Sequence, residues 1–160
     1  MNDKINRKKR MEELILKNKM NRKKEYGELF DECIEALQKE VNILSDSESE
    51  EMYDNLQRDF PFIKWGRIDW EKVDKKFKVN DIEEINSYIQ TNMKVIDDSV
   101  YVLWGYRDSP VIRTKLISAM GAIDDINVIG GDQWIYSPHD KYVIEFYHEG
   151  EIMIGYVDYS

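Results

Sequence analysis

The sequence is poor in the residues that build disulfides and metal centres. It contains one cysteine and two histidines among 160 residues. Cys33 therefore has no partner for an intrachain disulfide. A domain of this length buries roughly 68 to 70% of its unfolded surface, which is enough for a core without disulfides or metal. We expect a single domain that is stabilised by its core and needs no cofactor and no metal ion.

Long apolar runs are also missing from the sequence. No stretch approaches the roughly 18 uninterrupted apolar residues of a membrane-spanning helix. The N-terminus carries charged residues where a signal peptide would have an apolar run. These two absences predict a soluble, cytoplasmic protein with no membrane partner.

The common enzyme motifs are absent as well. The sequence has no glycine-rich phosphate loop with lysine, no Gly-x-Ser-x-Gly, no paired cysteine spacing and no His-Glu-x-x-His. His148 lies beside Glu149 and Glu151, but neighbouring side chains on a hairpin diverge, so polar turn residues explain this group better than a metal site. Cys33 falls on the apolar stripe of a helix and is expected to pack in the core. We do not expect the protein to be an enzyme.

Charge divides the chain into two parts. Residues 1–24 hold ten Lys or Arg and three Asp or Glu, for a charge of +7, whereas residues 25–160 hold 13 basic and 29 acidic residues, for −16. We expect residues 1–24 to be a basic helical or disordered extension and residues 25–160 to be one acidic domain. An acidic domain repels nucleic acid and attracts basic partners. The alternative explanation of the charge is that it keeps the protein soluble. The basic extension lacks the aromatic residues that stack on bases, so no nucleic-acid partner is predicted.

The first half of the domain reads as helical. Apolar residues at helical spacing predict a helix over about residues 25–42. Ser and Asp residues at 45–49 offer N-caps for a second helix, which should end before Pro61. The aromatic-rich segment that follows is predicted to be irregular, and Asp81 is expected to cap a third helix.

The second half reads as mostly extended. A short run rich in β-branched and aromatic residues predicts a strand at 99–106. Ser109 and Pro110 have the types of an N-cap and a first helical residue, which predicts a helix over 111–123. A strand should follow Gly130 and Gly131, and a hairpin closes the chain. The expected fold class is α+β, with an antiparallel or mixed sheet of about four strands, helices on one face, and N-terminal helices.

The closing hairpin holds a carboxylate among large apolar residues. If Glu149 and Gly150 form a two-residue turn, Phe146 faces Met153, and Glu145 lies on the second face of the hairpin. That face is either covered by a helix, with Glu145 at its margin, or open as an aromatic and acidic patch for another molecule. We expect the other face to pack on the core, and four residues to form its centre: Trp104, Trp134, Ile144 and Phe146.

Residues 101–157 carry a pattern that resembles the bacterial immunity proteins of polymorphic-toxin and contact-dependent growth-inhibition systems. The resemblance rests on a Trp after an apolar strand, a Pro-led helix that ends in "IDD", and three further short motifs, and it covers about residues 55–158. These features are Trp104, Pro110, "IDD" at 123–125, "WIYSP" at 134–138, "VIEFYHEGEI" at 143–152 and "GRIDWEKV" at 66–73.

The resemblance implies a small, non-enzymatic cytoplasmic protein that binds the C-terminal domain of a cognate toxin and blocks it. The acidity of the domain suggests a basic toxin, such as a nuclease. A non-catalytic adaptor or scaffold that binds a basic partner is the alternative. The candidate partner-binding residues lie on and near the closing hairpin: Asp132, Glu145, Tyr147, His148, Glu149, Glu151, Tyr156 and Asp158.

Overall fold

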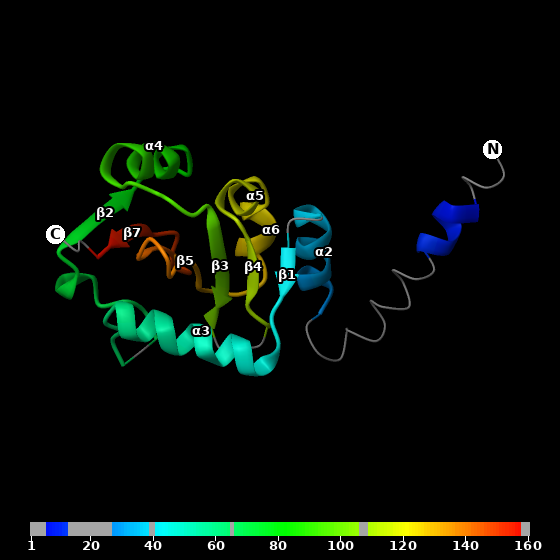
Figure 1. Cartoon of the computed structure of the whole chain (residues 1–160), viewed down its shortest axis with the longest axis horizontal. Coiled ribbons are helices and arrows are strands. Elements are labelled where there is room, and N and C mark those ends of the chain that lie inside the picture. The colour runs from blue at the N-terminus through cyan, green and yellow to red at the C-terminus, as the bar shows by residue number, and fades with distance from the viewer. Residues whose placement is uncertain (1–5, 13–26, 39–40, 65, 106–108, 158–160) are drawn as a thin grey trace.

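The centre of the molecule is a seven-stranded sheet in the order β1-β4-β3-β5-β6-β7-β2 (Figure 1). This computed structural model describes residues 6–12, 27–38, 41–64, 66–105 and 109–157. All neighbouring strands are antiparallel, which confirms the α+β class with an antiparallel sheet. The expected number of about four strands is wrong. The strands are β1 (Val41–Ile43), β2 (Lys75–Val79), β3 (Ser99–Trp104), β4 (Ile112–Lys115), β5 (Gln133–Ser137), β6 (Tyr142–Phe146) and β7 (Ile152–Tyr156).

The helices surround this sheet. They are α2 (Glu28–Leu37), α3 (Asp46–Asp59), α4 (Glu83–Asn92), α5 (Leu116–Gly121) and α6 (Ile123–Asn127), with a 3-10 turn at Trp70–Lys72. α3 begins and ends where local signals predict. The Ser45 hydroxyl accepts from the Glu48 N–H, and the Glu48 carboxylate accepts from the Ser45 N–H, which is a capping box. The helix ends two residues before Pro61.

Two predicted helices have to be shortened. The helix expected over 25–42 ends at Leu37, and residues 41–43 pair with β4 instead. The helix expected over 111–123 is wrong in its first part, because Ile112–Lys115 form β4 between β3 and β1. In β4 burial alternates with a period of two, as in a strand. Ser109 and Pro110 precede this strand, so they do not cap a helix.

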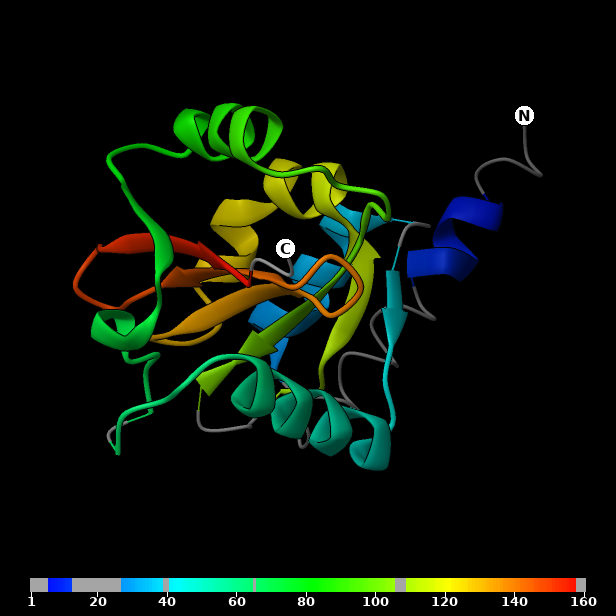
Figure 2. The same cartoon turned by 60° about the vertical axis from the view of Figure 1, so that its left-hand side comes forward.

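Both faces of the sheet are covered, whereas helices on one face were expected. The first face packs against α2, α4, α5 and α6. The second face packs against α3 and against residues 60–73, an irregular segment that ends in the 3-10 turn. Figures 1 and 2 show α3 on the opposite side of the sheet from α2. The four residues predicted for the core are buried, with Trp104, Ile144 and Phe146 on the first face and Trp134 on the second.

The closing hairpin has a different register from the predicted one. The Tyr147 N–H donates to the Glu151 carbonyl at 2.9 Å, and the Gly150 N–H donates to the Tyr147 carbonyl at 2.9 Å. Residues 148–150 are therefore a three-residue loop, and Gly150 takes a φ of 89°, which glycine adopts without a Cβ clash.

This longer loop shifts every pair in the hairpin by one residue. Phe146 faces Ile152, not Met153. Because side chains alternate along a strand, the shift moves Met153 to the face of Glu145 and moves Ile152 to the face of Phe146. The predicted division of the hairpin into two faces is therefore wrong for β7 and correct for β6.

The N-terminal extension is described only in part. Residues 6–12 are helical and their side chains are exposed. The division between residues 1–24 and the acidic domain stays a prediction. Among the described residues, no helix combines the length and the apolar character needed to cross a membrane.

Candidate functional site

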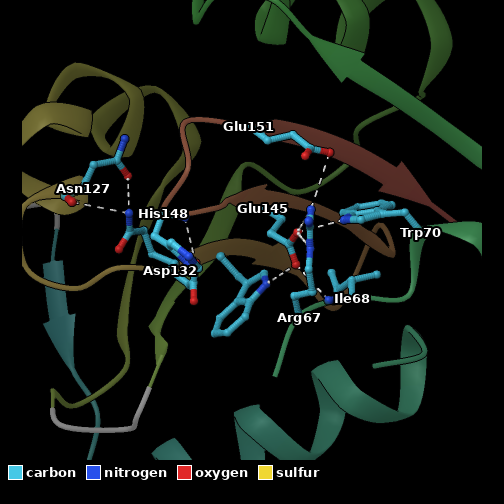
Figure 3. A network of polar contacts seen from close by, with 10 residues as sticks. Arg67, Ile68, Trp70, Asn127, Asp132, Glu145, His148 and Glu151 are labelled. Atoms are coloured by element: carbon cyan, nitrogen blue, oxygen red, sulfur yellow. Dashed lines mark hydrogen bonds and ion pairs between the residues drawn. The ribbon is translucent and has the colours of Figure 1, made fainter. Parts of the chain in front are cut away.

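The Glu145 carboxylate is the centre of a buried polar network on the second face of the sheet (Figure 3). Glu145 is 0% exposed, and it is covered by residues 60–64 and 66–73, which we call the covering segment. This segment folds back on itself, since the Ile63 N–H donates to the Arg67 carbonyl and the Asp69 N–H donates to the Pro61 carbonyl. A charge that is buried this deeply is tolerated only when it is paired and hydrogen-bonded.

Five hydrogen bonds reach the two carboxylate oxygens of Glu145. Arg67 donates to Oε1 from Nε at 3.1 Å and from Nη2 at 2.8 Å. The Trp70 indole N–H donates to Oε1 at 2.8 Å, the Trp134 indole N–H donates to Oε2 at 3.0 Å, and the Ile68 backbone N–H donates to Oε2 at 2.9 Å. Three of these four residues belong to the covering segment. The carboxylate therefore fastens that segment to the sheet.

Arg67 connects the buried carboxylate to the surface. Its guanidinium lies 4.0 Å from the centre of the Tyr147 ring, and Nη2 lies 3.6 Å from a Glu151 carboxylate oxygen. Burial by itself would lower the pKa of Arg67, but Glu145, Glu151 and Tyr147 outweigh it and raise the pKa above its ordinary value. Arg67 is thus a fixed positive charge that positions an aromatic ring and an acid of the hairpin.

Trp70 closes the other end of the network by packing on Gly155. A Cβ atom at Gly155 would lie 2.6 Å from Cζ3 of Trp70 and 3.2 Å from Cγ1 of Val73. The distance of 2.6 Å is shorter than real Cβ contacts. The absence of a side chain at position 155 is what lets the indole lie against β7 and reach Glu145.

A second polar pair lies at the tip of the hairpin. Asp132 Oδ1 accepts from the His148 backbone N–H at 2.8 Å, and it lies 3.0 Å from Nδ1 of the His148 ring. The His148 and Tyr147 rings are in contact, with centroids 4.1 Å apart. Contacts therefore join five residues at the surface: Asp132, His148, Tyr147, Arg67 and Glu151. Together with the exposed Glu149 of the turn, we call them the tip surface.

The structure brings most of the predicted site residues together. His148 and Glu149 are exposed, and Asp132, Tyr147 and Glu151 are half-buried. Glu145 does not reach the surface, because its side chain is enclosed by the covering segment. Tyr156 is half-buried at the far end of β7, on the first face of the sheet and away from the tip. Asp158 lies outside the described residues.

Sequence reasoning missed Arg67 and Trp70. They are 78 and 75 residues from Glu145, and no local pattern predicts such contacts. The stretch "GRIDWEKV" at 66–73, which belongs to the resemblance, holds both of them together with Ile68. This stretch is the one signal that could have drawn attention to them.

In the part of the chain that the structure describes, the acidic and sulfur-bearing residues do not assemble into a metal site. Within the described ranges, no group of three or more His, Cys, Asp or Glu side chains is placed to hold a metal ion. Cys33 is buried in α2, and burial, with a smaller effect of Asp125, raises the pKa of its thiol to about 12. A thiol with this pKa stays protonated near neutral pH and is a poor nucleophile.

The fold and the site together define an α+β domain that uses a buried carboxylate to fasten an irregular segment beneath a charged and aromatic surface. Residues 27–155 match the family described as CdiI immunity protein EcoliA0-like. The chain belongs to this family, which confirms the predicted resemblance and places the protein among toxin-neutralising immunity proteins. No curated protein matches the chain.

Proposed function

We propose that this protein neutralises the toxin domain of a cognate contact-dependent growth-inhibition toxin by occlusion, with the tip surface as a contact region. The observation that carries the proposal is the organisation of this surface. Tyr147 contacts both Arg67 and His148, Glu149 lies in the turn, and Glu151 directly follows it. Aromatic residues with ordered charged neighbours are a common composition of interface hot spots.

The charge of the domain supports a basic toxin. Residues 25–160 carry a charge of −16, which steers a positively charged partner and raises its association rate. Enzymes that act on nucleic acids are often basic, because they bind phosphates. A nuclease toxin therefore fits the charge best, and its inhibition requires only that the immunity protein cover the nucleic-acid surface.

Rigidity also supports the tip surface as a binding region. Glu145 holds Arg67, which in turn holds Tyr147 and Glu151, while Asp132 fixes the backbone and ring of His148. Side chains that are ordered before binding lose little conformational entropy when the partner arrives. We expect Glu145 to contribute by positioning Arg67, without touching the toxin.

The test is a titration of the toxin domain encoded beside this chain's gene with the variant Glu149→Lys/Glu151→Lys. We expect the dissociation constant to rise by at least about tenfold, or about 1.4 kcal/mol, because two acids at an interface become repulsive. Association should also slow as salt is raised. Circular dichroism checks that the variant is folded.

A matched control changes the same net charge elsewhere. Asp74 and Asp98 are exposed and directly precede β2 and β3, at the end of the sheet opposite the hairpin tip. Asp74→Lys/Asp98→Lys should slow association slightly and leave the dissociation rate unchanged. Wild-type affinity of the tip variant would contradict the tip surface as the contact. If the wild-type protein does not bind the toxin at all, a non-catalytic adaptor for another basic partner becomes the better hypothesis.

A further inference from the structure

A hollow of about 300 Å³ lies on the second face of the sheet, beside α3 and away from the hairpin. Its floor is one row of the sheet, since Arg113 of β4 pairs with Asn42 of β1 on one side and with Tyr101 of β3 on the other. Its wall is the first half of α3, where three residues at helical spacing share a face: Glu48, Glu51 and Met52. Ile43 and Leu44 complete the lining.

The lining combines apolar sides with an acidic rim. Met52, Leu44 and Tyr101 are half-buried and pack on the second face of the sheet. Glu48 and Glu51 are exposed above them. Glu48 uses one oxygen in the capping box, and Glu51 has no ion-pair or hydrogen-bond partner among the described residues. The hollow therefore offers apolar walls at its base and carboxylates at its mouth.

The charge around the hollow determines whether it favours a cation or an anion. α3 contains six acidic residues and one basic residue, Arg58. Arg113 adds one positive charge inside the hollow, where its Nη2 donates to the Ser99 hydroxyl at 3.3 Å. The two carboxylates of the rim outnumber this guanidinium, and the other acidic residues of α3 increase the excess of negative charge. A cation is therefore favoured over an anion.

We infer that this hollow binds an arginine or lysine side chain of a basic protein partner. The aliphatic stem of such a side chain packs on Met52, Leu44 and the Tyr101 ring, and its charged head lies between Glu48 and Glu51. Arg and Lys bury their stems while keeping the charge near water, which is the division that the lining offers. The inference rests on the proposed function for the identity of the partner, which is the toxin domain, and it adds a second contact region.

The first test needs no toxin. The full-length chain, labelled with ¹⁵N, is titrated with Nα-acetyl-arginine methylamide, and the amide signals of Ile43, Met52 and Tyr101 are followed by NMR. The matched probe is Nα-acetyl-citrulline methylamide, which has the same shape without the charge. We expect saturable shifts at these three residues with the arginine probe and at least about fivefold weaker binding of the citrulline probe, equal to about 1 kcal/mol.

Variants then locate the charge that matters. Glu48→Gln/Glu51→Gln should abolish the preference for arginine over citrulline, and glutamine at position 48 still supports the capping box. The matched control is Glu32→Gln/Glu35→Gln, which removes two exposed acids of α2 on the opposite face of the sheet and should leave the preference unchanged. Equal binding of both probes, shifts elsewhere only, or equal losses in the two variants would overturn the inference. Shifts at the hollow that depend on protein concentration without any probe would assign it to a second copy and also overturn it.

The second test uses the toxin domain and separates the two proposals. Glu48→Gln/Glu51→Gln should raise the dissociation constant of the toxin complex by about fivefold or more while the tip surface is intact. If the toxin does not bind the wild-type chain but the arginine probe does, the proposed function fails and the cation-binding hollow stands. If the toxin binds and the rim variant has wild-type affinity, the hollow is not a toxin contact and this inference fails alone.

Discussion

The two faces of the sheet are covered in different ways. On the first face, α2, α4, α5 and α6 bring apolar side chains onto the strands. On the second face, α3 covers one part, but residues 60–73 cover the other part with little regular structure. At this second place the interface is built around the Glu145 carboxylate.

The difference follows from where the backbone hydrogen bonds go. A helix satisfies its own amide groups, so it can cover a sheet with apolar side chains alone. An irregular segment must find other acceptors for its buried donors. Glu145 accepts from the Ile68 amide, the Trp70 indole and the Arg67 guanidinium, so one residue satisfies donors from three residues of the segment. A buried charge is the means by which an irregular segment covers this sheet.

The variant Glu145→Gln should have the largest effect on the stability of the second face. Glutamine keeps the volume of the side chain but replaces one acceptor oxygen by an NH2 group, which then faces N–H donors. The substitution also leaves Arg67 without its negatively charged partner. We expect a loss of about 3 kcal/mol or more in the free energy of unfolding, measured by urea denaturation. Because Trp70 and Trp134 donate to this carboxylate, tryptophan fluorescence should change as well.

Arg67→Met is the companion variant. Arg67 is partly exposed, and Glu145 would keep three neutral donors in its absence. We expect a smaller loss than for Glu145→Gln. If the two variants cost the same, the ion pair and not the set of neutral donors holds the segment, and our account of the second face needs to be revised.

Phe146→Ala tests the helix-covered face. Phe146 is 3% exposed and packs in the first cluster, so its truncation leaves a cavity among apolar residues. We expect a loss of about 3 to 5 kcal/mol in urea denaturation, without the fluorescence change expected for Glu145→Gln. An unchanged denaturation midpoint would contradict the placement of Phe146 in the core.

Gly155→Ala tests the contact between Trp70 and β7. The added Cβ atom would meet a rigid indole ring at 2.6 Å, so Trp70 must move away from Glu145. We expect a loss of about 1 to 3 kcal/mol, measured by thermal or urea unfolding. Gly121→Ala is the matched control, since a Cβ atom there meets nothing within 4 Å, and it should leave stability unchanged or slightly higher.

Deletion of residues 1–20 should have the smallest effect. This segment lacks a complete apolar stripe, and residues 6–12 expose their side chains. We expect the melting temperature to stay within a few degrees of the wild-type value. A fall of more than about 8 °C, which corresponds to more than about 2 kcal/mol for a domain of this size, would show that the extension belongs to the fold.

Local signals in the sequence predicted the elements that are defined locally. The caps at Ser45 and the stop before Pro61 bound α3, and the β-branched and aromatic runs gave β3, β5, β6 and β7. The elements that were missed are defined by distant partners. β1 has only three residues, and β2 carries three lysines, so neither resembles a buried strand until β4 and β7 lie beside it.

The site was predictable in part for the same reason. His148, Glu149 and Glu151 stand around a glycine turn, and the sequence places them together without any tertiary information. The burial of Glu145 was not predictable, because it depends on Arg67, Ile68 and Trp70, which are 75 to 78 residues away along the chain. The predicted register of the hairpin is wrong by one residue, because the sequence alone did not distinguish a two-residue turn from a three-residue turn at Gly150.

The length of that turn limits how the hairpin can change during evolution or in engineering. Insertion or deletion of one residue within 148–150 would rotate β7 by one position and bring a different set of side chains beneath residues 60–73. The interior would then lose its fit around Gly155 and Trp70. New partner specificities at the tip are therefore accessible by substitution at fixed loop length, and libraries that randomise residues 148 and 149 should keep Gly150 and the residue count unchanged.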